Sequence, residues 1–233
     1  MTQAKTLAIV GAGPGLGLSI AKRFGAAGFQ VALLARNASK LGELTAELER
    51  AGVTARSYVA DITDRAALVA ALASVDAEMG PVDVLEFGPM PAMPPVSAPN
   101  ASPEDVQSVF EQQVLGAVAA VNAVLPGMRS RGSGALLITT GASSVTPIAM
   151  MGAIGPAMAA LRNYAITLHQ ALAHEGVYAA HVAIDLRITP GAGEADPDAL
   201  AERYFELYEQ RDRAEIKVGN LVAEALAAAA TRT

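Results

Sequence analysis

A glycine-rich turn directly after the first apolar segment constrains the fold of this chain more than any other feature. Residues 10–17 read VGAGPGLG and follow the apolar run Thr6–Val10. Gly11, Gly15 and Gly17 have the spacing GxxxGxG, at the junction between a strand pattern and a helix pattern. Because glycine has no side chain, such a turn lets the backbone approach a pyrophosphate, whose charge then lies at the amide-rich helix N-terminus. The alternative is a tight turn that binds nothing.

The spacing also separates this turn from two other phosphate-binding patterns. The fingerprint GxGxxG requires glycine at position 16, where Leu16 stands, and no frame reads GxxxxGK. We expect Gly11, Gly15, Leu16 and Gly17 to contact a dinucleotide cofactor.

Strand and helix patterns alternate along the rest of the chain. Short apolar runs predict strands at Thr6–Val10, Gln30–Ala35, Ala55–Ala60, Val82–Phe87, Ala135–Thr140, Val177–Ile184 and Glu215–Val218. Apolar residues three and four apart predict helices between them, among them Ser19–Phe29, a long helix from Ser102 to about Met128, Gly155–His174 and Ala199–Glu209. Repeated strand–helix units imply right-handed crossovers. We therefore expect one domain over residues 1–233, an α/β fold with a Rossmann-like, doubly wound parallel sheet and helices on both faces.

One segment between these elements predicts a ligand-binding loop. Residues 88–101 contain five prolines and no charged side chain, so they cannot continue a strand or a helix. They follow the carboxyl end of a predicted strand, which is where doubly wound sheets bind ligands.

Composition narrows the classes of function. The net charge of −6 without a basic run predicts no nucleic-acid partner, and the absence of cysteine excludes disulfides, thiolate catalysis and cysteine-bound metal. The three histidines have no obvious convergent carboxylates, so we expect no metal site. The long apolar stretches are broken by glycine and proline, and no export signal is evident. We expect a cytoplasmic protein without a membrane partner.

The end of the second predicted strand bears on which dinucleotide is preferred. An NAD site usually carries an acid about 20 residues beyond the glycines, whereas this chain has Arg36 there. A guanidinium can pair with a 2′-phosphate through charge-assisted hydrogen bonds. Arg36 therefore favours NADP(H), with NAD(H) as the alternative if Arg36 is only a solvated charge.

With these residues in place, the chain resembles the short-chain dehydrogenase/reductase family over nearly its whole length. Asp61 and Ile62 look like the family's adenine-contacting pair. The segment DVLEFG (Asp83–Gly88) falls where the family writes DVLVNNAG, without either asparagine. The resemblance implies a homodimer or homotetramer formed through the helices predicted near residues 102–128 and 155–174.

The same alignment shows four departures at the family's catalytic positions. Gln113 stands in place of asparagine, and Gly141 in place of serine. The segment IGPAMAAL aligns with YxxSKAAL, so that Ile154 replaces the tyrosine and Met158 the lysine. None of the five tyrosines of the chain has a lysine four positions later. The resemblance therefore leaves the catalytic residues unknown.

These departures have a physical consequence, because the family's lysine lowers the pKa of its tyrosine toward neutrality and so enables proton exchange. Isoleucine and methionine cannot exchange a proton. Arg162, Glu86 and Asp185 are alternative charged groups near the expected site, each with a structural role as the competing interpretation. The two replacements make the expected pocket apolar, and four further methionines add to it: Met90, Met93, Met150 and Met151. Such a pocket either binds an apolar small molecule or is filled by its own side chains.

Three functions remain open from the sequence. The first is an NADP(H)-binding protein that lacks the family's standard chemistry. The second is an oxidoreductase with a different proton donor. The third is a redox-neutral enzyme, such as a cyclase or dehydratase, that uses the inherited pocket.

Overall fold

A seven-stranded parallel sheet organises the computed structural model, which describes residues 4–230. The strands are β1 (Thr6–Val10), β2 (Gln30–Ala35), β3 (Ala55–Val59), β4 (Val82–Phe87), β5 (Gly134–Gly141), β6 (Val177–Ile184) and β7 (Glu215–Val218). Their order in the sheet is β3-β2-β1-β4-β5-β6-β7, and every neighbouring pair is parallel. The predicted parallel, doubly wound sheet is confirmed.

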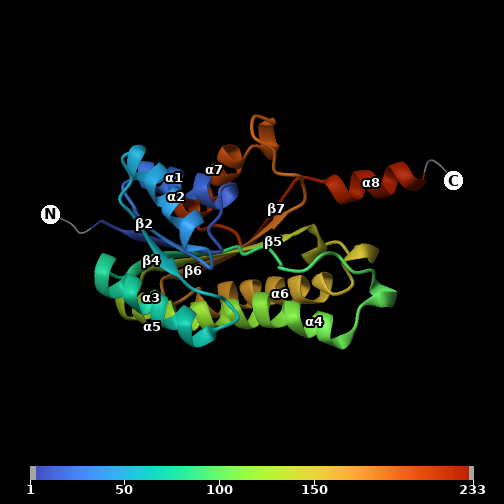
Figure 1. The fold of residues 1–233 in the computed structure, drawn as a ribbon, viewed down its shortest axis with the longest axis horizontal. Coiled ribbons are helices and arrows are strands. Elements are labelled where there is room, and N and C mark those ends of the chain that lie inside the picture. Colours follow the sequence, from blue (N-terminus) through green and yellow to red (C-terminus); the bar gives the residue numbers. More distant parts are fainter. Residues whose placement is uncertain (1–3, 231–233) are drawn as a thin grey trace.

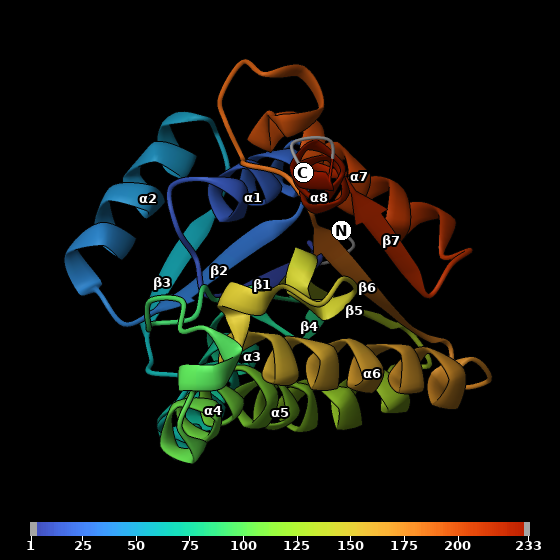
Figure 2. The ribbon, with the colours of Figure 1, turned by 90° about the vertical axis from the view of Figure 1, so that its right-hand side faces the viewer.

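Helices cover both faces of this sheet (Figures 1 and 2). One face carries α1 (Leu16–Ala26), α2 (Ala38–Arg50) and α7 (Pro197–Gln210), and the other carries α3 (Arg65–Met79), α4 (Pro103–Phe110), α5 (Gly116–Arg131) and α6 (Ile154–Leu172). Helix α8 (Leu221–Ala230) extends away from the body in Figure 1.

The two layers of helices enclose two apolar cores because successive side chains of a strand point to opposite faces. In β1, Leu7 and Ile9 pack toward α1 and α7, whereas Ala8 and Val10 pack toward α3, α5 and α6. The inner strands β1, β2, β4, β5 and β6 are buried on both faces, which explains why they are mainly apolar in the sequence, whereas the edge strands β3 and β7 are partly exposed.

Two helices differ from the sequence-based expectation. Helix α1 starts at Leu16, three residues before the predicted start, because Gly15 serves as its N-cap directly after the glycine turn. The long helix expected from Ser102 is interrupted by a π-helical turn, Glu111–Leu115, between α4 and α5. Such turns insert one extra residue per turn and are frequent at functional sites, and periodicity did not reveal this one.

One stretch of the described chain, Pro103–Arg131, is long and apolar enough to cross a membrane by length and composition alone. Half of its most apolar window is buried inside the fold, as in the core helix of a globular domain.

Candidate functional site

Two adjoining cavities lie at the carboxyl ends of the strands, where β2 and β4 flank β1 on opposite sides. Their volumes are about 510 and 370 Å³. They share Gly11, Gly13, Pro14, Pro89 and Met90 as walls. The chain reverses its winding direction at this point of the sheet, which is the usual ligand site of doubly wound folds. Together the cavities form one crevice, called the crevice below.

The glycine turn forms the centre of the crevice. Gly11 has φ of +91°, and a Cβ added there would lie 2.5 Å from the Cα of Pro89. Two amides of the turn, those of Gly11 and Ala12, donate to the Leu34 carbonyl oxygen. Only glycine fits this backbone conformation and this close approach without strain.

The N-terminus of α1 points into the same region. Gly15, Leu16 and Gly17 all line the larger cavity. The N-cap Gly15 has no side chain to bond the first amides of the helix. The Leu18 amide donates to the Gly13 carbonyl oxygen, so the amides of Leu16 and Gly17 are the donors that face an anion at this end. The structure therefore brings together all four residues that the sequence assigned to the pyrophosphate.

The smaller cavity carries the positive charge of the crevice. Arg36, Asp61 and Ile62 line it, as the sequence-based assignment requires, together with Lys40. The Arg36 Nη1 and Asp61 Oδ2 atoms are 3.9 Å apart, and the arginine side chain is 64% exposed. The backbone N–H of Thr63 lowers the pKa of Asp61, with burial opposing it, so this carboxyl is ionised at neutral pH. The sequence-based assignment did not include Lys40. Its position four residues after Arg36, in the first turn of α2, indicates that it lies at the same edge of the sheet.

The larger cavity is mainly apolar. Its walls include Met158, Ile184, Leu186 and Ile188 in addition to the loop after β4. Among its wall residues in the described chain, only Thr139 and Thr140 have polar side chains, and both lie at the end of β5. A mainly apolar pocket with a few converging polar groups is typical of a small-molecule site.

The four residues that the sequence comparison aligns with the family's catalytic positions separate into two groups. Gly141 and Met158 line the larger cavity, whereas Ile154 and Gln113 do not. Ile154 is buried one turn before Met158 on α6. Gln113 is buried on the π-helical turn, which packs against α6, and its Nε2 atom has no hydrogen-bond partner. A Cβ added at Gly141 would meet no atom within 4 Å, so a larger residue fits there.

Thr139 connects the cavity to a buried carboxyl group. Its hydroxyl donates to Glu86 Oε1 at 2.6 Å and lies 2.7 Å from the Tyr204 hydroxyl. Burial raises the pKa of Glu86 to about 7, against a smaller lowering by the Thr139 hydrogen bond. Burial also raises the pKa of Tyr204, with the nearby Glu86 adding to the effect, so this phenol stays protonated at neutral pH.

Thr140 belongs to a second network on the opposite face of the sheet. Its hydroxyl lies 2.7 Å from both Ser144 Oγ and His181 Nε2, and His181 Nδ1 lies 2.8 Å from Glu215 Oε1. Arg162 pairs with Glu215 through two nitrogens, at 2.5 and 2.8 Å. The hydrogen bond from Arg162 lowers the pKa of Glu215, while burial lowers the pKa of His181, so the imidazole is neutral and donates to a carboxylate.

These networks decide the roles of two candidate proton sources. Arg162 is held by Glu215 and does not line the crevice, so it does not restore positive charge beside Met158. Asp185 is fully buried, lies 2.7 Å from the Lys217 ammonium and accepts a hydrogen bond from the Val222 amide. It therefore joins the end of β6 to β7 and to the start of α8. Both residues have a structural role.

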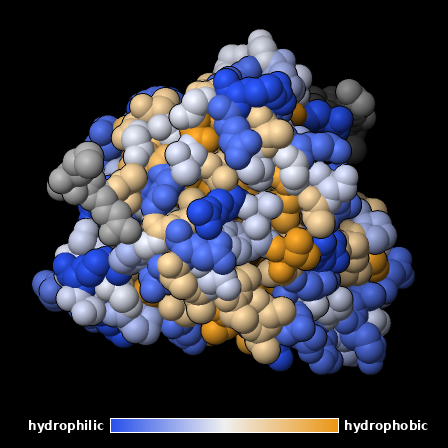
Figure 3. Space-filling model, turned by 60° about the vertical axis from the view of Figure 1, so that its left-hand side comes forward, coloured by the Kyte–Doolittle hydropathy of each residue, from blue (hydrophilic) through white to orange (hydrophobic). Residues whose placement is uncertain are grey.

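The methionines also divide between surface and core. Met90 is 86% exposed at the mouth of the crevice and Met150 is 57% exposed, whereas Met93 and Met151 pack against the core under α6. On the face drawn in Figure 3, apolar and polar side chains are interspersed.

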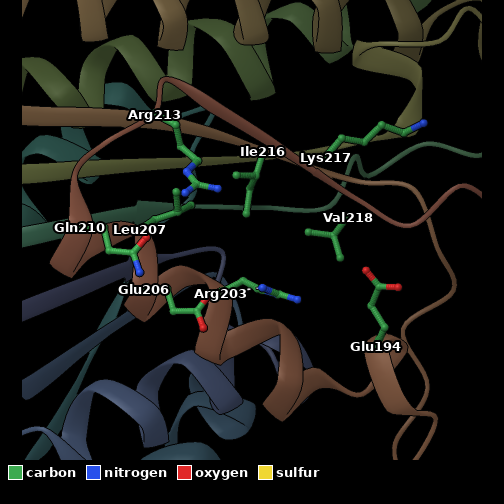
Figure 4. Close-up of a pocket in the computed structure, with 9 residues that line it drawn as sticks. All are labelled: Glu194, Arg203, Glu206, Leu207, Gln210, Arg213, Ile216, Lys217 and Val218. Carbon is green, nitrogen blue, oxygen red and sulfur yellow. Dashed lines mark hydrogen bonds and ion pairs between the residues drawn. The ribbon is translucent and has the colours of Figure 1, made fainter.

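A third cavity, of about 420 Å³, lies between α7 and β7 and is separate from the crevice (Figure 4). Three of its cationic wall residues form ion pairs within the protein: Arg203 with Glu206, Arg213 with Asp212, and Lys217 with Asp185. In the described part of the chain, no group of three or more His, Cys, Asp or Glu side chains is placed to hold a metal ion.

Comparison with known proteins identifies the family. The short chain dehydrogenase family profile matches residues 5–198. A short chain dehydrogenase of the fungus Pseudocercospora fijiensis is 29% identical over 83% of this chain, and an NADP-dependent 3-hydroxy acid dehydrogenase of Shigella flexneri is 32% identical over 69%. The alignments span 61% and 63% of the lengths of these two relatives.

Solved structures give the same fold. A short-chain dehydrogenase from Rhodopseudomonas palustris is 27% identical, with a TM-score of 0.82 over 94% of this chain and 100% of that one. L-Sorbose reductase from Gluconobacter frateurii, complexed with NADPH and L-sorbose, has a TM-score of 0.83 over 94% of this chain and 97% of that one, at 22% identity. The family that the sequence resembles is confirmed: the chain belongs to the short-chain dehydrogenase family.

Proposed function

We propose that this protein binds NADP(H) along the crevice and has lost the tyrosine- and lysine-dependent carbonyl reduction of its family. One observation carries the proposal. A single crevice has the glycine turn at its centre, cationic side chains at one end, and Gly141 and Met158 at the other.

The crevice residues fit a dinucleotide phosphate. The Gly11 turn leaves no room for a side chain, and the α1 N-terminus offers amides to the pyrophosphate. Arg36 and Lys40 are the cations available to a 2′-phosphate, and Asp61 and Ile62 are the expected adenine contacts. The Shigella relative is named NADP-dependent and the sorbose reductase was solved with NADPH, which supports the same preference here.

A bound nicotinamide supplies or takes a hydride, and the family's phenol supplies the matching proton. In this chain Ile154 and Met158 have no exchangeable proton, and Gly141 has no hydroxyl. No tyrosine of the described residues lines either cavity. Loss of a positioned general acid costs about 10²–10⁴ in rate.

Cofactor binding is tested by NADPH fluorescence titration of the wild type and Arg36→Ala. The loss of a charge-assisted contact weakens NADPH binding roughly tenfold while NADH binding stays the same. Arg50→Ala is the matched control, because Arg50 is exposed on α2 and lies outside both cavities. No NADPH binding up to millimolar concentration would remove the proposal, and a preference for NADH would remove the role of Arg36.

The lost chemistry is tested by restoring Gly141→Ser, Ile154→Tyr and Met158→Lys together. Position 141 has space for the added side chain, whereas position 158 is buried and must take up a charge. We expect this triple variant to reduce carbonyl compounds with NADPH at least about 10² times faster than the wild type. A triple variant that binds NADPH without this gain would show that these positions alone do not account for the lost activity.

The larger cavity is also the proposed site of an apolar small molecule, because its wall residues in the described chain have no polar side chains apart from Thr139 and Thr140. We further propose a cytoplasmic homodimer or homotetramer formed through α4, α5 and α6. Light scattering at micromolar concentration tests the assembly, and a monomer there would contradict it.

Thr139 and Thr140 favour a second candidate, an oxidoreductase with a proton donor other than tyrosine. These two residues are the polar wall residues of an otherwise apolar cavity in the described chain, and each hydroxyl is hydrogen-bonded to a buried titratable group. A fall in NADPH absorbance in the presence of excess carbonyl compound, which reports oxidation of NADPH, supports this candidate. Unchanged absorbance with conversion of the compound supports a redox-neutral enzyme instead.

A further inference from the structure

The Glu86 carboxyl group is buried directly behind the wall of the larger cavity. A Cβ added to the wall residue Gly88 would lie 2.5 Å from Glu86 Oε1 and 3.1 Å from Thr139 Cβ. Gly88 and Thr139, which both line the larger cavity, are therefore in direct contact with this carboxyl group. Glycine at position 88 leaves the space that the carboxyl occupies.

The surroundings of Glu86 contain no positive charge. Its neighbours in the sheet are Ile9 on β1 and Leu137 on β5, and its side chain accepts from the Thr139 hydroxyl. On α7, the titratable group on this side is Tyr204, which reaches Glu86 through Thr139 and stays protonated. Within the described residues, no Lys, Arg or His nitrogen lies within 4 Å of the Glu86 carboxyl.

The other acids near the site, the buried Asp185 and the half-buried Glu215, have partners that explain them. Asp185 has Lys217 and an amide, and Glu215 has Arg162 and His181. A buried carboxyl group without a cation costs stability, so its place beside a cavity points to a function.

We propose that the Thr139 hydroxyl donates a proton to the oxygen atom of an apolar carbonyl compound bound in the larger cavity, and that Glu86 replaces this proton. Thr139 is then a catalytic residue, and Glu86 acts through it as a positioning residue. The proposal rests on the proposed binding of NADP(H) for the source of hydride.

The proton balance is complete with groups of this chain and solvent. When the carbonyl carbon gains a hydride, negative charge develops on its oxygen, and the Thr139 Oγ1–H bond breaks as the proton moves to that oxygen. Before the step, the protonated Glu86 carboxyl donates to Thr139 Oγ1, which leaves the Thr139 proton free for the substrate oxygen. Thr139 Oγ1 takes the Glu86 proton as its own proton leaves, and the resulting carboxylate accepts from the Thr139 hydroxyl, which is the direction of the hydrogen bond in the structure. Solvent returns one proton to Glu86. An acid with a pKa of about 7 is suited to this exchange at neutral pH.

The Thr140 network is a weaker candidate for the same role. His181 is neutral and donates from Nδ1 to Glu215, so its Nε2 atom carries no hydrogen and has no proton to give to Thr140. Arg162 and Glu215 bind each other closely and tie α6 to β7. This network is accounted for by its structural role.

The test compares Glu86→Gln, Thr139→Val and Thr139→Ser with the wild type, using NADPH and the apolar diketone phenanthrenequinone. We expect kcat/KM to fall by about 10²-fold or more in Glu86→Gln and Thr139→Val, and to stay within a few-fold in Thr139→Ser, which keeps the hydroxyl. The wild-type kcat/KM should decline as pH rises through about 7, and Glu86→Gln should lose this dependence. Glu49→Gln, at an exposed acid of α2, is the control for loss of a carboxylate.

A second measurement needs no cofactor. With ¹³C-labelled glutamate side chains, the Glu86 resonance is assigned by its loss in Glu86→Gln, and its pH titration is followed by NMR in the ligand-free protein. Because the Thr139 hydrogen bond lowers the pKa of Glu86, Thr139→Val should shift the titration to higher pH and Thr139→Ser should not.

The outcomes separate the two proposals. Failure of the wild type to bind NADPH by fluorescence titration overturns the proposed function. Intact NADPH binding without reduction of phenanthrenequinone, or with reduction that Glu86→Gln and Thr139→Val leave unchanged, overturns the proton donor. A Glu86 resonance that titrates like an exposed glutamate also overturns it.

Discussion

Replacing Glu86 with glutamine should change how the stability of the fold depends on pH. Glutamine has nearly the same shape and can keep a hydrogen bond to Thr139, but it never becomes charged. The wild-type carboxyl group is buried without a cation, and burial raises its pKa from 4.5 to about 7. The stability that the protonated Glu86 carboxyl contributes to the fold is therefore fully present below pH 4.5 and is lost as pH rises through about 7.

The size of the effect follows from that difference in pKa. Each tenfold change in proton affinity is about 1.4 kcal/mol, so ionisation of Glu86 lowers the free energy of unfolding by about 3 kcal/mol above pH 8. For a chain of this length, that corresponds to roughly 6–12 °C in the melting temperature.

Chemical denaturation of the wild type and Glu86→Gln at intervals between pH 4 and pH 9 measures the effect. The other titrating groups, His181 and Glu215 among them, contribute equally to both proteins. Their contributions therefore cancel in the difference between the two free energies of unfolding. Between pH 4 and pH 8, we expect the free energy of unfolding of Glu86→Gln to rise by about 3 kcal/mol relative to that of the wild type, with most of the change below pH 7. A difference that stays constant with pH would refute the assignment of a raised pKa to Glu86.

Four further substitutions test the site and the contacts around it. Gly11→Ala should destabilise the fold by about 1–3 kcal/mol and abolish NADPH binding, because Gly11 has φ of +91° and its Cβ would meet Pro89, whereas Gly141→Ala should change stability by less than about 0.5 kcal/mol. Thermal melting and fluorescence titration compare the two, and equal effects would contradict the reasoning. Gln113→Met should raise the free energy of unfolding by about 1 kcal/mol by removing an unpartnered buried Nε2, and a loss of stability in urea denaturation would show that the amide has a partner. Lys217→Met should cost about 3–5 kcal/mol by leaving the buried Asp185 unpaired, and unchanged melting would show that the pair contributes nothing.

The sequence alone determined the fold class and the cofactor end of the crevice, because both depend on local patterns. Five strands have the predicted bounds, and for the inner strands the reason is that a strand buried on both faces is a mainly apolar run with sharp ends. The glycine turn and Arg36 lie within 30 residues of one another, on consecutive elements whose carboxyl ends meet at one edge of the sheet. Their convergence in the crevice follows from parallel pairing.

Only the tertiary structure decided which polar groups meet beside the larger cavity. Thr139 reaches Glu86 across 53 residues and Tyr204 across 65, and these contacts depend on the order of the strands and on the helix that covers that face. The same arrangement pairs Arg162 with Glu215 and Asp185 with Lys217. Arg162 and Asp185 are therefore not free charges at the site. A sequence states which residues can titrate, but partners and burial, which set the pKa of each group, exist only after the sheet and its two layers of helices are assembled.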